Sequence, residues 1–354
     1  MARVYKVGIL GGSGMTGGEL LRLLAVHPGF EVVWATSREY TGKPVYNVHP
    51  HLYSFYQGLR FTGFSERLFE EADVVFNALP HGVGVQITAD AHDRGLTVVD
   101  LSADYRLKNP KLYEEVYGFK HPRPDLLEAS VYALPELHRD ELANTRLASS
   151  PGCNATATIL AAAPLVAGGL LGDLRLVSDV KAGSSEGGSK PSRGSHHPFR
   201  EGSLRPYSPW GHRHAFEVEQ ELSRLAGDRV SVTLIPHTVP LVRGAFASVH
   251  GWLRDGVSLR DVAAAYAKFY GGSRFVRVKP MMKGAVSEPP DVKNVAGSEF
   301  VEVGFSAESR TRRVTGFAAV DNLVRGAAGQ AIHAANIMLG FPEETGLFYP
   351  PLKP

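Results

Sequence analysis

The sequence predicts an α/β domain with a doubly wound parallel sheet, followed by an α+β domain with a mostly antiparallel sheet. Three observations lead to this fold class. The first third of the chain alternates strand and helix patterns, and the middle third has many strand patterns with few helices between them. The length of 354 residues suits two domains. We place the first domain at 1–152 and the second at 153–321, and we expect the helical C-terminal segment, 322–354, to pack back on the first.

In the first domain, short β-branched runs bounded by turn residues predict strands at 4–10, 31–36, 73–78 and 97–101. Between the first two strands, residues 17–27 place four leucines on one helix face. Thr16 and Glu19 have the spacing of a capping box at the start of that helix. This strand–helix alternation predicts a parallel sheet.

The second domain is expected to open with a helix at Cys153 or Asn154, directly after the turn-like residues 149–152. Further helices are predicted at 215–225, at 261–270 with Ser258 and Asp261 at capping spacing, and at about 326–339. The last of these is rich in alanine and glycine and should pack closely against a neighbour. Strand patterns in this part of the chain lie at 174–181, 230–236, 244–253, 275–278 and 300–306.

Composition excludes several classes of function. The content of 44% hydrophobic and 21% charged residues is that of an ordinary globular protein. With 38 Lys plus Arg against 36 Asp plus Glu, no positive excess is available to bind nucleic-acid phosphates. The longest apolar stretch, 159–171, is interrupted by Pro164 and is too short to span a membrane. The single cysteine argues for a reducing compartment, so we expect a cytoplasmic protein that binds neither nucleic acid nor membrane.

A glycine-rich loop joins the first strand to the first helix. Glycines at 11, 14 and 17 permit a tight turn and a close approach to a pyrophosphate, which would rest on the N-terminus of the helix. The spacing differs from the GxGxxG pattern typical of NAD, and a purely structural turn is the alternative interpretation. In its strand–loop–helix setting, the loop predicts a Rossmann-type cofactor site formed by Gly11, Ser13, Gly14, Met15 and Thr16.

The end of the second strand indicates which cofactor is bound. NAD-binding domains usually place an acidic residue there, whereas this chain has Ser37-Arg38-Glu39. Ser37 and Arg38 can bind a 2′-phosphate, which favours NADP, with NADPH as hydride donor. Glu39, one position beyond the usual acidic residue, is included in the predicted site. Asn322 precedes the last helix and can hydrogen-bond the cofactor's carboxamide. The alternative is an ordinary capped helix, with Asp321 or Asn322 as the cap.

Cys153 is the candidate nucleophile. At the start of a helix, the partial positive charge of the backbone lowers a thiol pKa and favours the thiolate, although a lone cysteine can also simply fill the core. His212 and His214, in Gly211-His212-Arg213-His214, are candidate acid–base residues because histidine titrates near neutral pH. Zinc binding by these histidines is the competing interpretation. We expect no metal, since no carboxylate lies at helical ligand spacing.

A basic loop spans residues 181–214. It holds six Lys or Arg and four His against two Glu, and it is rich in Gly, Ser and Pro. Such a segment is either a solvated loop or an anion-binding surface for a substrate or an acidic partner. The candidate residues for a phosphate or for such a partner are Lys181, Arg193 and Arg205 in this loop and Arg106 in the first domain.

Seven motifs occur together over nearly the whole chain, at 11–20, 78–82, 100–107, 133–136, 151–153, 211–214 and 322–330. This set resembles the N-acetyl-γ-glutamyl-phosphate reductase family, whose wider group includes aspartate-semialdehyde dehydrogenase with the same two-domain plan. The resemblance implies NADPH-dependent reduction of an acyl phosphate to a semialdehyde. Cys153 would form a thioester and release phosphate, His212 with His214 would carry protons and position substrate, and Asn322 would face the nicotinamide.

Two departures concern the substrate. The arginine-pathway enzymes read Gly-Cys-Tyr-Pro-Thr at the cysteine and Ser-Gly-x-Ser-Gly-Ala-Gly-Arg in a following loop. This chain has Asn154-Ala155-Thr156 after the cysteine and Gly-Ser-Ser-Glu-Gly-Gly-Ser-Lys at 183–190. Both changes resemble the lysine-pathway branch, whose substrate, 2-aminoadipate 6-phosphate, is joined through its amino group to a small acidic carrier protein. The basic loop suits such a partner.

The resemblance therefore implies a carrier-linked aminoadipyl-phosphate reductase of lysine biosynthesis. The alternatives are N-acetyl-γ-glutamyl-phosphate reductase of arginine biosynthesis, an enzyme that serves both pathways, and an NADP-sensing protein without catalysis. We expect a homo-oligomer, either dimer or tetramer, that associates through the strand-rich second domain.

Overall fold

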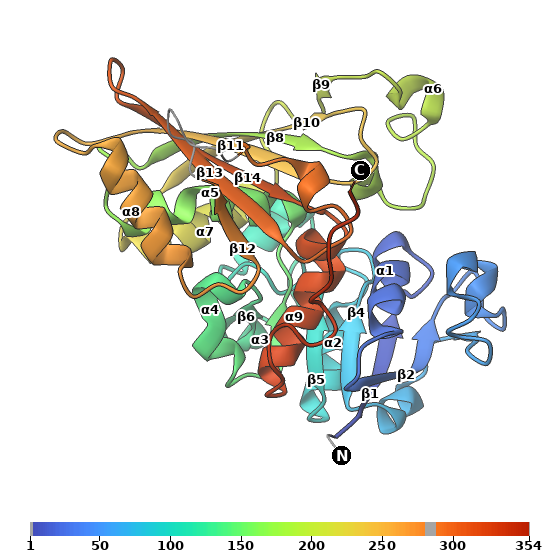
Figure 1. The fold of residues 1–354 in the computed structure, drawn as a ribbon. Coiled ribbons are helices and arrows are strands. Elements are labelled where there is room, and N and C mark those ends of the chain that lie inside the picture. Colours follow the sequence, from blue (N-terminus) through green and yellow to red (C-terminus); the bar gives the residue numbers. More distant parts are fainter. Residues whose placement is uncertain (1–2, 280–287, 354) are drawn as a thin grey trace. The chain divides into compact units, whose positions relative to one another are not determined.

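The computed structural model describes residues 3–279 and 288–353 (Figure 1). The chain divides into two compact units, Met1–Pro151 with Ala327–Phe348 and Gly152–Gly326 with Tyr349–Pro354. The sequence placed the division one residue later and assigned all of 322–354 to the first domain. In the structure, the residues up to Gly326 and those from Tyr349 onward belong to the second unit.

The first unit is built on a seven-stranded sheet with the order β3-β2-β1-β4-β5-β7-β6, in which every pair of neighbours is parallel. The four predicted strands and the parallel sheet are confirmed. Many of their apolar side chains, such as those of Val7, Val75 and Phe76, are fully buried. The strands are β1 (Tyr5–Leu10), β2 (Phe30–Thr36), β3 (Phe61–Thr62), β4 (Val74–Asn77), β5 (Thr97–Asp100), β6 (Val131–Tyr132) and β7 (Leu147–Ser149). The helices are α1 (Met15–Leu24), α2 (Val85–Asp93), α3 (Asp125–Ala129), α4 (Pro135–Leu142) and α9 (Gly329–Met338).

Helix α1 begins earlier than the sequence predicts, and it begins without a side-chain cap. Its N-cap is Gly14, and the expected capping box is wrong: Glu19 is buried and forms an ion pair with Arg22 at 2.8 Å. Helix α9 contacts α1, α4 and β5 within the first unit. His27 contacts both α9 and the chain beyond it: its Nε2 lies 3.0 Å from Asn336 Oδ1 of the helix, and its ring lies edge-on to that of Phe341 with centroids 5.8 Å apart.

The second unit contains a mixed seven-stranded sheet with the order β12-β13-β14-β11-β8-β10-β9. The β12–β13 and β8–β10 pairs are parallel and the other pairs antiparallel, as expected for a mostly antiparallel sheet. The strands are β8 (Arg175–Ala182), β9 (Arg205–Pro206), β10 (Ser231–Thr238), β11 (Ala245–Trp252), β12 (Val276–Lys279), β13 (Val301–Glu308) and β14 (Arg313–Val320). The helices are α5 (Cys153–Ala167), α6 (His197–Arg200), α7 (His214–Ala226) and α8 (Leu259–Tyr270).

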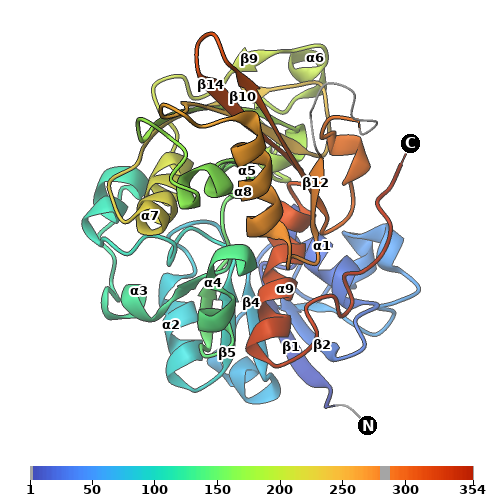
Figure 2. The same ribbon diagram turned by 60° about the vertical axis from the view of Figure 1, so that its left-hand side comes forward.

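Helices α5, α7 and α8 lie on one face of this sheet (Figures 1 and 2). Helix α5 is the centre of the core, because its residues from Asn154 to Val166 are all buried. It runs through Pro164, which the sequence treats as an interruption. Proline has no N–H to offer the carbonyl four residues before it, and the Leu160 carbonyl instead accepts a hydrogen bond from Tyr270 Oη at 2.5 Å.

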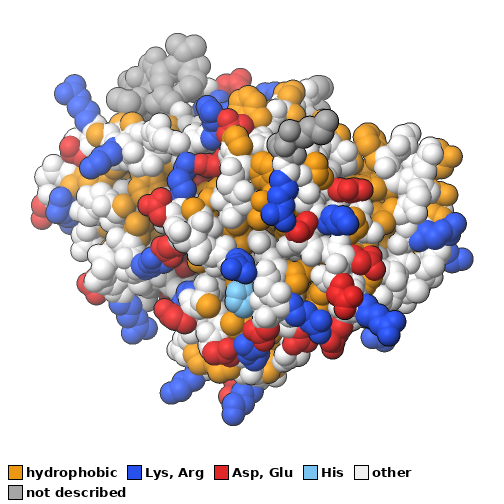
Figure 3. All heavy atoms as spheres, turned by 90° about the horizontal axis from the view of Figure 1, so that it is seen from below, with side chains coloured by type: hydrophobic (Ala, Val, Ile, Leu, Met, Phe, Trp, Pro, Cys, Tyr) orange, Lys and Arg blue, Asp and Glu red, His pale blue; other side chains and the backbone are white. Residues whose placement is uncertain are grey.

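On the face seen in Figure 3, lysine and arginine side chains are interspersed with aspartate and glutamate. Within residues 3–279 and 288–353, no helix has the length and apolarity needed to cross a membrane.

Candidate active site

The glycine-rich loop of the first unit is sterically dependent on its glycines. Gly11 has a φ of +78°, and a Cβ added there would lie 2.7 Å from the Ala78 carbonyl oxygen. A Cβ added at Gly17 would lie 2.4 Å from the Gly11 carbonyl oxygen. The first turn of α1 has neither a side-chain cap nor an acidic residue. This arrangement fits a diphosphate, which the N–H groups of an uncapped helix end can bind.

The predicted ribose-binding residues lie beside this loop. Ser13 Oγ and Ser37 Oγ are 2.9 Å apart, and the Gly11 N–H donates to Thr36 Oγ1 at 3.1 Å. Ser37 is buried, whereas Arg38 and Glu39 are exposed at the end of β2. The first unit thus brings together the predicted cofactor residues of the loop and of β2, with Arg38 accessible to a ligand.

In the second unit, Cys153 is the first residue of α5, and glycines pack closely around it. A Cβ added at Gly152 would lie 2.3 Å from His214 Nε2, so this glycine allows the imidazole to approach the backbone just before the thiol. A Cβ added at Gly326 would lie 2.5 Å from Cys153 Cβ. Because neither glycine carries a side chain, the motifs at 211–214 and 322–330 can both approach the cysteine closely.

The two candidate histidines pack against each other at the start of α7. Their ring centroids are 4.5 Å apart with nearly perpendicular planes. His214 Nε2 lies 3.9 Å from Glu217 Oε1, and the other oxygen of Glu217 accepts the Gly152 N–H at 3.0 Å. His212 Nδ1 accepts the His214 backbone N–H at 3.2 Å, so the neutral His212 ring carries its proton on Nε2. Burial lowers the pKa of His212 to about 4, and the ring is neutral at physiological pH.

These residues line one pocket with a volume of about 300 Å³. Cys153, His212 and His214 were predicted from the sequence, and the structure places them together. The pocket also contains Glu186 and Tyr207, which sequence reasoning did not assign to the site. Its described lining is completed by Asn154, Gly183, Ser184, Gly187, Ser192, Gly194, Ser195, Arg200, Arg205, Arg213 and Thr238.

Glu186 lies directly beside the candidate nucleophile. Cys153 Sγ is 3.6 Å from Glu186 Oε2, and Tyr207 Oη donates a hydrogen bond to Oε1. The Asn154 amide in turn donates to Tyr207 Oη at 3.1 Å. Burial raises the pKa of the Glu186 carboxyl. The one signal in the sequence is the departure from the family pattern at 183–190, which by itself indicates a different substrate and assigns no role to Glu186.

The predicted basic residues are distributed differently from the expectation. Arg205 lines the pocket, whereas Arg193 is exposed over the Phe199 ring at 5.3 Å and Lys181 lies on the sheet face opposite the helices. Arg106 belongs to the first unit, where it is buried and donates to the Ser150 and Leu101 carbonyls at 2.7 and 3.0 Å. Arg200 and Arg213, two basic residues of the same loop that were not among the predicted candidates, also line the pocket.

Asn322 has a structural role that the sequence did not indicate. Its side chain is buried, accepts the Gly244 N–H at 2.8 Å and donates to Ser185 Oγ at 2.9 Å. It therefore holds the loop that carries Glu186. The helical turn that follows is capped by Asp321, whose carboxylate accepts the N–H groups of Leu323 and Val324 at 2.9 Å each.

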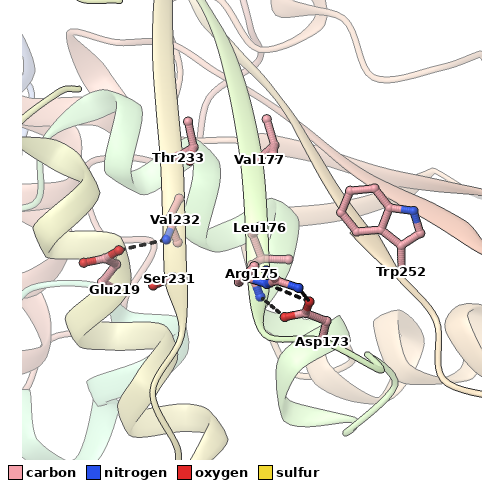
Figure 4. A pocket seen from close by; sticks show the side chains of 9 residues that line it. All are labelled: Asp173, Arg175, Leu176, Val177, Glu219, Ser231, Val232, Thr233 and Trp252. Carbon is pink, nitrogen blue, oxygen red and sulfur yellow. Dashed lines mark hydrogen bonds and ion pairs between the residues drawn. The ribbon is translucent and has the colours of Figure 1, made fainter. Parts of the chain in front are cut away.

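A metal centre and a second cavity are the other possible kinds of site. Across the described part of the chain, no group of three or more His, Cys, Asp or Glu side chains is arranged to hold a metal ion. A cavity of about 580 Å³ lies along β8 and β10 (Figure 4). There Asp173 pairs with Arg175 and Glu219 accepts the Val232 N–H at 2.8 Å, so its charged groups are already engaged and it contains no thiol.

Comparison with known proteins agrees with this arrangement. Residues 6–145 match the semialdehyde dehydrogenase NAD-binding domain, and residues 153–322 match the semialdehyde dehydrogenase dimerisation domain. The fold is similar to aspartate semialdehyde dehydrogenase II of Vibrio cholerae in complex with ASA, at 14% identity and a TM-score of 0.72 over 96% of this chain and 99% of that one. It is also similar to the Candida albicans enzyme with NADP, at 18% identity and a TM-score of 0.69 over 95% and 98% of the two chains.

Fold and site together define an oxidoreductase of the semialdehyde dehydrogenase class with an NAD(P)-binding domain. A protein of Aeropyrum pernix is 61% identical over the full length of both chains. The LysW-L-2-aminoadipate/LysW-L-glutamate phosphate reductase of Sulfurisphaera tokodaii is 54% identical over 99% of this chain and 100% of its own, and that of Saccharolobus solfataricus is 53% identical over 99% and 98%. The chain belongs to this family of phosphate reductases.

Proposed function

We propose that this protein reduces carrier-bound 2-aminoadipate 6-phosphate, and carrier-bound glutamate phosphate, to the semialdehydes with release of phosphate. It thereby serves lysine biosynthesis by the aminoadipate pathway as well as arginine biosynthesis. The observation that carries this proposal is the pocket in which Cys153 begins α5 beside His212 and His214. The names of the relatives specify both substrates in LysW-bound form, which supports the two-pathway alternative over a reductase of N-acetylglutamyl phosphate.

The residues of the pocket suit covalent catalysis. Cys153 Sγ attacks the acyl carbon, a thioester forms and phosphate leaves with the bonding electron pair. The neutral His212 ring donates from Nε2 to the oxygen that becomes negative in the tetrahedral intermediate. NADPH, when bound, supplies the hydride that reduces the thioester. The resulting hemithioacetal on Cys153 collapses to the aldehyde and frees the thiol.

The basic side chains of the pocket suit the phosphate of the substrate. Arg200 is anchored by its Nη2, which donates to the Ala182 and Val239 carbonyls at 2.8 and 3.1 Å, and Arg205 and Arg213 are exposed at the same pocket. The two substrates differ by one methylene, which a pocket discriminates by only about 1–3 kcal/mol. The carrier attached to the amino group therefore supplies most of the selectivity against free and acetylated amino acids.

The direct test runs the reaction in reverse, with NADP, inorganic phosphate and a semialdehyde, and follows the absorbance of NADPH. We expect turnover with carrier-linked aminoadipate semialdehyde and with carrier-linked glutamate semialdehyde. Turnover with N-acetylglutamate semialdehyde alone would replace the proposal by the acetylated arginine pathway. Binding of NADP without turnover of any aldehyde would favour the sensor.

NADP is proposed as the cofactor because Arg38 is exposed at the end of β2 beside Ser37. Its site comprises Gly11, Ser13, Gly14, Met15, Thr16, Ser37, Arg38 and Glu39, while a contact from Asn322 stays a prediction. Arg38→Ala should weaken NADPH binding by about 10- to 100-fold and leave NADH binding unchanged, since a charge-assisted hydrogen bond contributes about 1.5–3 kcal/mol. Fluorescence titration of both nucleotides measures this, with Arg67→Ala, an exposed arginine of the first unit outside the proposed site, as control. An equal loss for the two nucleotides would contradict the assignment.

The basic loop is proposed as the surface that receives a small acidic carrier. It combines arginines with exposed apolar side chains, among them Trp210 at 98% and Leu204 at 69% exposure. Arg193→Glu should lower kcat/KM for the carrier-linked substrate by about tenfold at low salt, with little change in kcat, because charge complementarity mainly sets the encounter rate. Steady-state kinetics over a salt series checks this. Arg310→Glu, an equal charge change outside the loop, is the control, and an equal effect of both variants would argue against a docking role.

Homo-oligomerisation is proposed through the sheet face that α5, α7 and α8 leave uncovered. Half-buried apolar side chains lie there, including Val177, Ile235 and a pair formed by Phe246 and Phe317 with ring centroids 6.1 Å apart. The match to a dimerisation domain covers this sheet. On this face Lys181 would belong to a subunit interface rather than to the substrate site, and a dimer is the simplest assembly that covers it.

A further inference from the structure

We propose that Glu186 accepts the proton of the Cys153 thiol when the thioester forms and returns it to sulfur when the aldehyde is released. This inference rests on the proposed role of Cys153 as nucleophile. It assigns a catalytic residue beyond the cysteine and the two histidines, within the loop where this chain departs from the arginine-pathway pattern.

The first support is that Glu186 is held in place beside the sulfur. It lies in a single 3₁₀ turn, Ser184–Gly187, that directly follows β8. Ser185 Oγ donates to the Val242 carbonyl at 2.7 Å, and the Asn322 amide donates to the same hydroxyl at 2.9 Å. These bonds fix the turn, so the distance of 3.6 Å between Cys153 Sγ and Glu186 Oε2 belongs to an ordered arrangement.

The second support is that the two carboxylate oxygens of Glu186 have different partners. Oε1 accepts the hydrogen bond from Tyr207 Oη, which is itself oriented by the Asn154 amide. The oxygen that faces the sulfur is Oε2. A proton that arrives on Glu186 is therefore carried on the oxygen next to Sγ, from which it can return.

The third support is the state of the histidines. A neutral His212 has its Nδ1 lone pair in a hydrogen bond with the His214 N–H and its proton on Nε2, so it enters the pocket as a donor. Its pKa of about 4 means that it does not hold a positive charge near neutral pH to pair with a thiolate. His214 directs Nε2 toward Glu217. Glu186 Oε2, which lies 3.6 Å from Cys153 Sγ, is a proton acceptor in direct contact with the thiol.

Burial and the neighbouring groups act on the pKa of the Glu186 carboxyl in opposite directions. Burial raises the pKa of its carboxyl, while the hydrogen bonds from Tyr207 and Cys153 and the positive charges of Arg213 and Arg200 act in the lowering direction. The raising effect of burial is the largest of these. A carboxylate of raised pKa binds a proton more readily than an exposed one, as general-base catalysis requires.

In the proposed step, each electron pair and the transferred proton have a defined destination. As the S–C bond forms, the S–H electron pair stays on sulfur, the proton moves to Glu186 Oε2, and the C–O bond to phosphate breaks with its pair on phosphate. When the hemithioacetal collapses, the C–S bond breaks with its pair on sulfur. Sulfur then takes back the proton from Oε2, and the carboxylate is regenerated.

The test compares Glu186→Gln with Glu288→Gln, an exposed carboxylate of the second unit outside both the basic loop and the pocket. In the wild type, kcat should fall at acid pH as Glu186 becomes protonated and loses its capacity to accept. We expect E186Q to lower kcat by about 10²- to 10⁴-fold with little change in KM, and to lack that acid limb. E288Q should retain both the rate and the limb. An acid limb that persists unchanged in E186Q would overturn the proposal, whatever the loss of rate.

Tyr207→Phe provides a second measurement should E186Q fail to fold. It removes the donor to Oε1 and so raises the pKa of Glu186, which should move the acid limb of kcat to higher pH. A limb at the wild-type pH would count against the proposal. Cys153→Ser separates this inference from the proposed function: if C153S keeps turnover, the proposed function fails, whereas an inactive C153S with an unshifted limb in Y207F removes only the role of Glu186.

Discussion

Replacing Cys153 with serine is expected to lower turnover by at least on the order of 10³-fold, because a hydroxyl ionises far less readily than a thiol and is a weaker nucleophile. The measurement is phosphate-dependent formation of NADPH from the carrier-linked semialdehyde. Serine is close to cysteine in size, so NADPH affinity and the melting temperature should match those of the wild type. These two quantities are the internal control.

The same variant decides between catalysis and sensing. Since Cys153 is the single cysteine of the chain, incorporation of one thiol-directed label in the wild type and none in C153S verifies the substitution. A C153S protein that retained turnover within about tenfold of the wild type would contradict the covalent mechanism, because a residual rate of that size is incompatible with loss of the nucleophile.

Replacing Arg325 with methionine is expected to reduce the free energy of unfolding by about 3–5 kcal/mol. Arg325 and Glu299 are both fully buried in the second unit, with Arg325 Nη1 2.8 Å from Glu299 Oε1. Removal of the guanidinium leaves a carboxylate in the core without its opposite charge. Chemical denaturation monitored by circular dichroism measures the loss.

The matched control is Arg310→Met, which removes an arginine from an exposed pair with Glu308, also in the second unit. Exposed pairs of this kind contribute no more than about 1 kcal/mol, so the control should unfold near the wild-type denaturant concentration. Equal destabilisation by the two substitutions would show that burial of the Arg325–Glu299 pair does not account for its effect on the free energy of unfolding.

The sequence predicted the elements whose pattern is local. The strands of the first unit are short apolar runs, and the glycines at 11 and 17 were recognised because their backbone approach follows from the strand–loop–helix order. Strand β14 was missed because its glycine weakens the strand pattern. Gly316 is required by tertiary packing instead, since a Cβ there would lie 2.2 Å from the Ala161 carbonyl oxygen of α5.

The candidate site could be predicted only in part, because tertiary contacts position some of its residues. Cys153, His212 and His214 stand in motifs with recognisable chemistry. Glu186 and Tyr207 meet Cys153 through a turn and a loop whose positions depend on contacts with distant residues such as Asn322 and Val242. No periodicity or spacing in the sequence predicts that these residues lie together. The start of α1 was also predicted wrongly, because Thr16 and Glu19 have capping-box spacing although α1 has no side-chain cap.

The hydrogen bond from Tyr270 to the Leu160 carbonyl has a consequence for how the second unit folds. The carbonyl that Pro164 leaves without an N–H lies in the buried helix, 110 residues away in sequence from its donor. Until α8 docks, this turn of α5 carries an unsatisfied polar group that water must solvate, which opposes burial of the helix. We therefore expect the C-terminal half of α5 and the end of α8 to fold as one cooperative unit. Because of Pro164, α5 reaches its full stability only when α8 is packed against it.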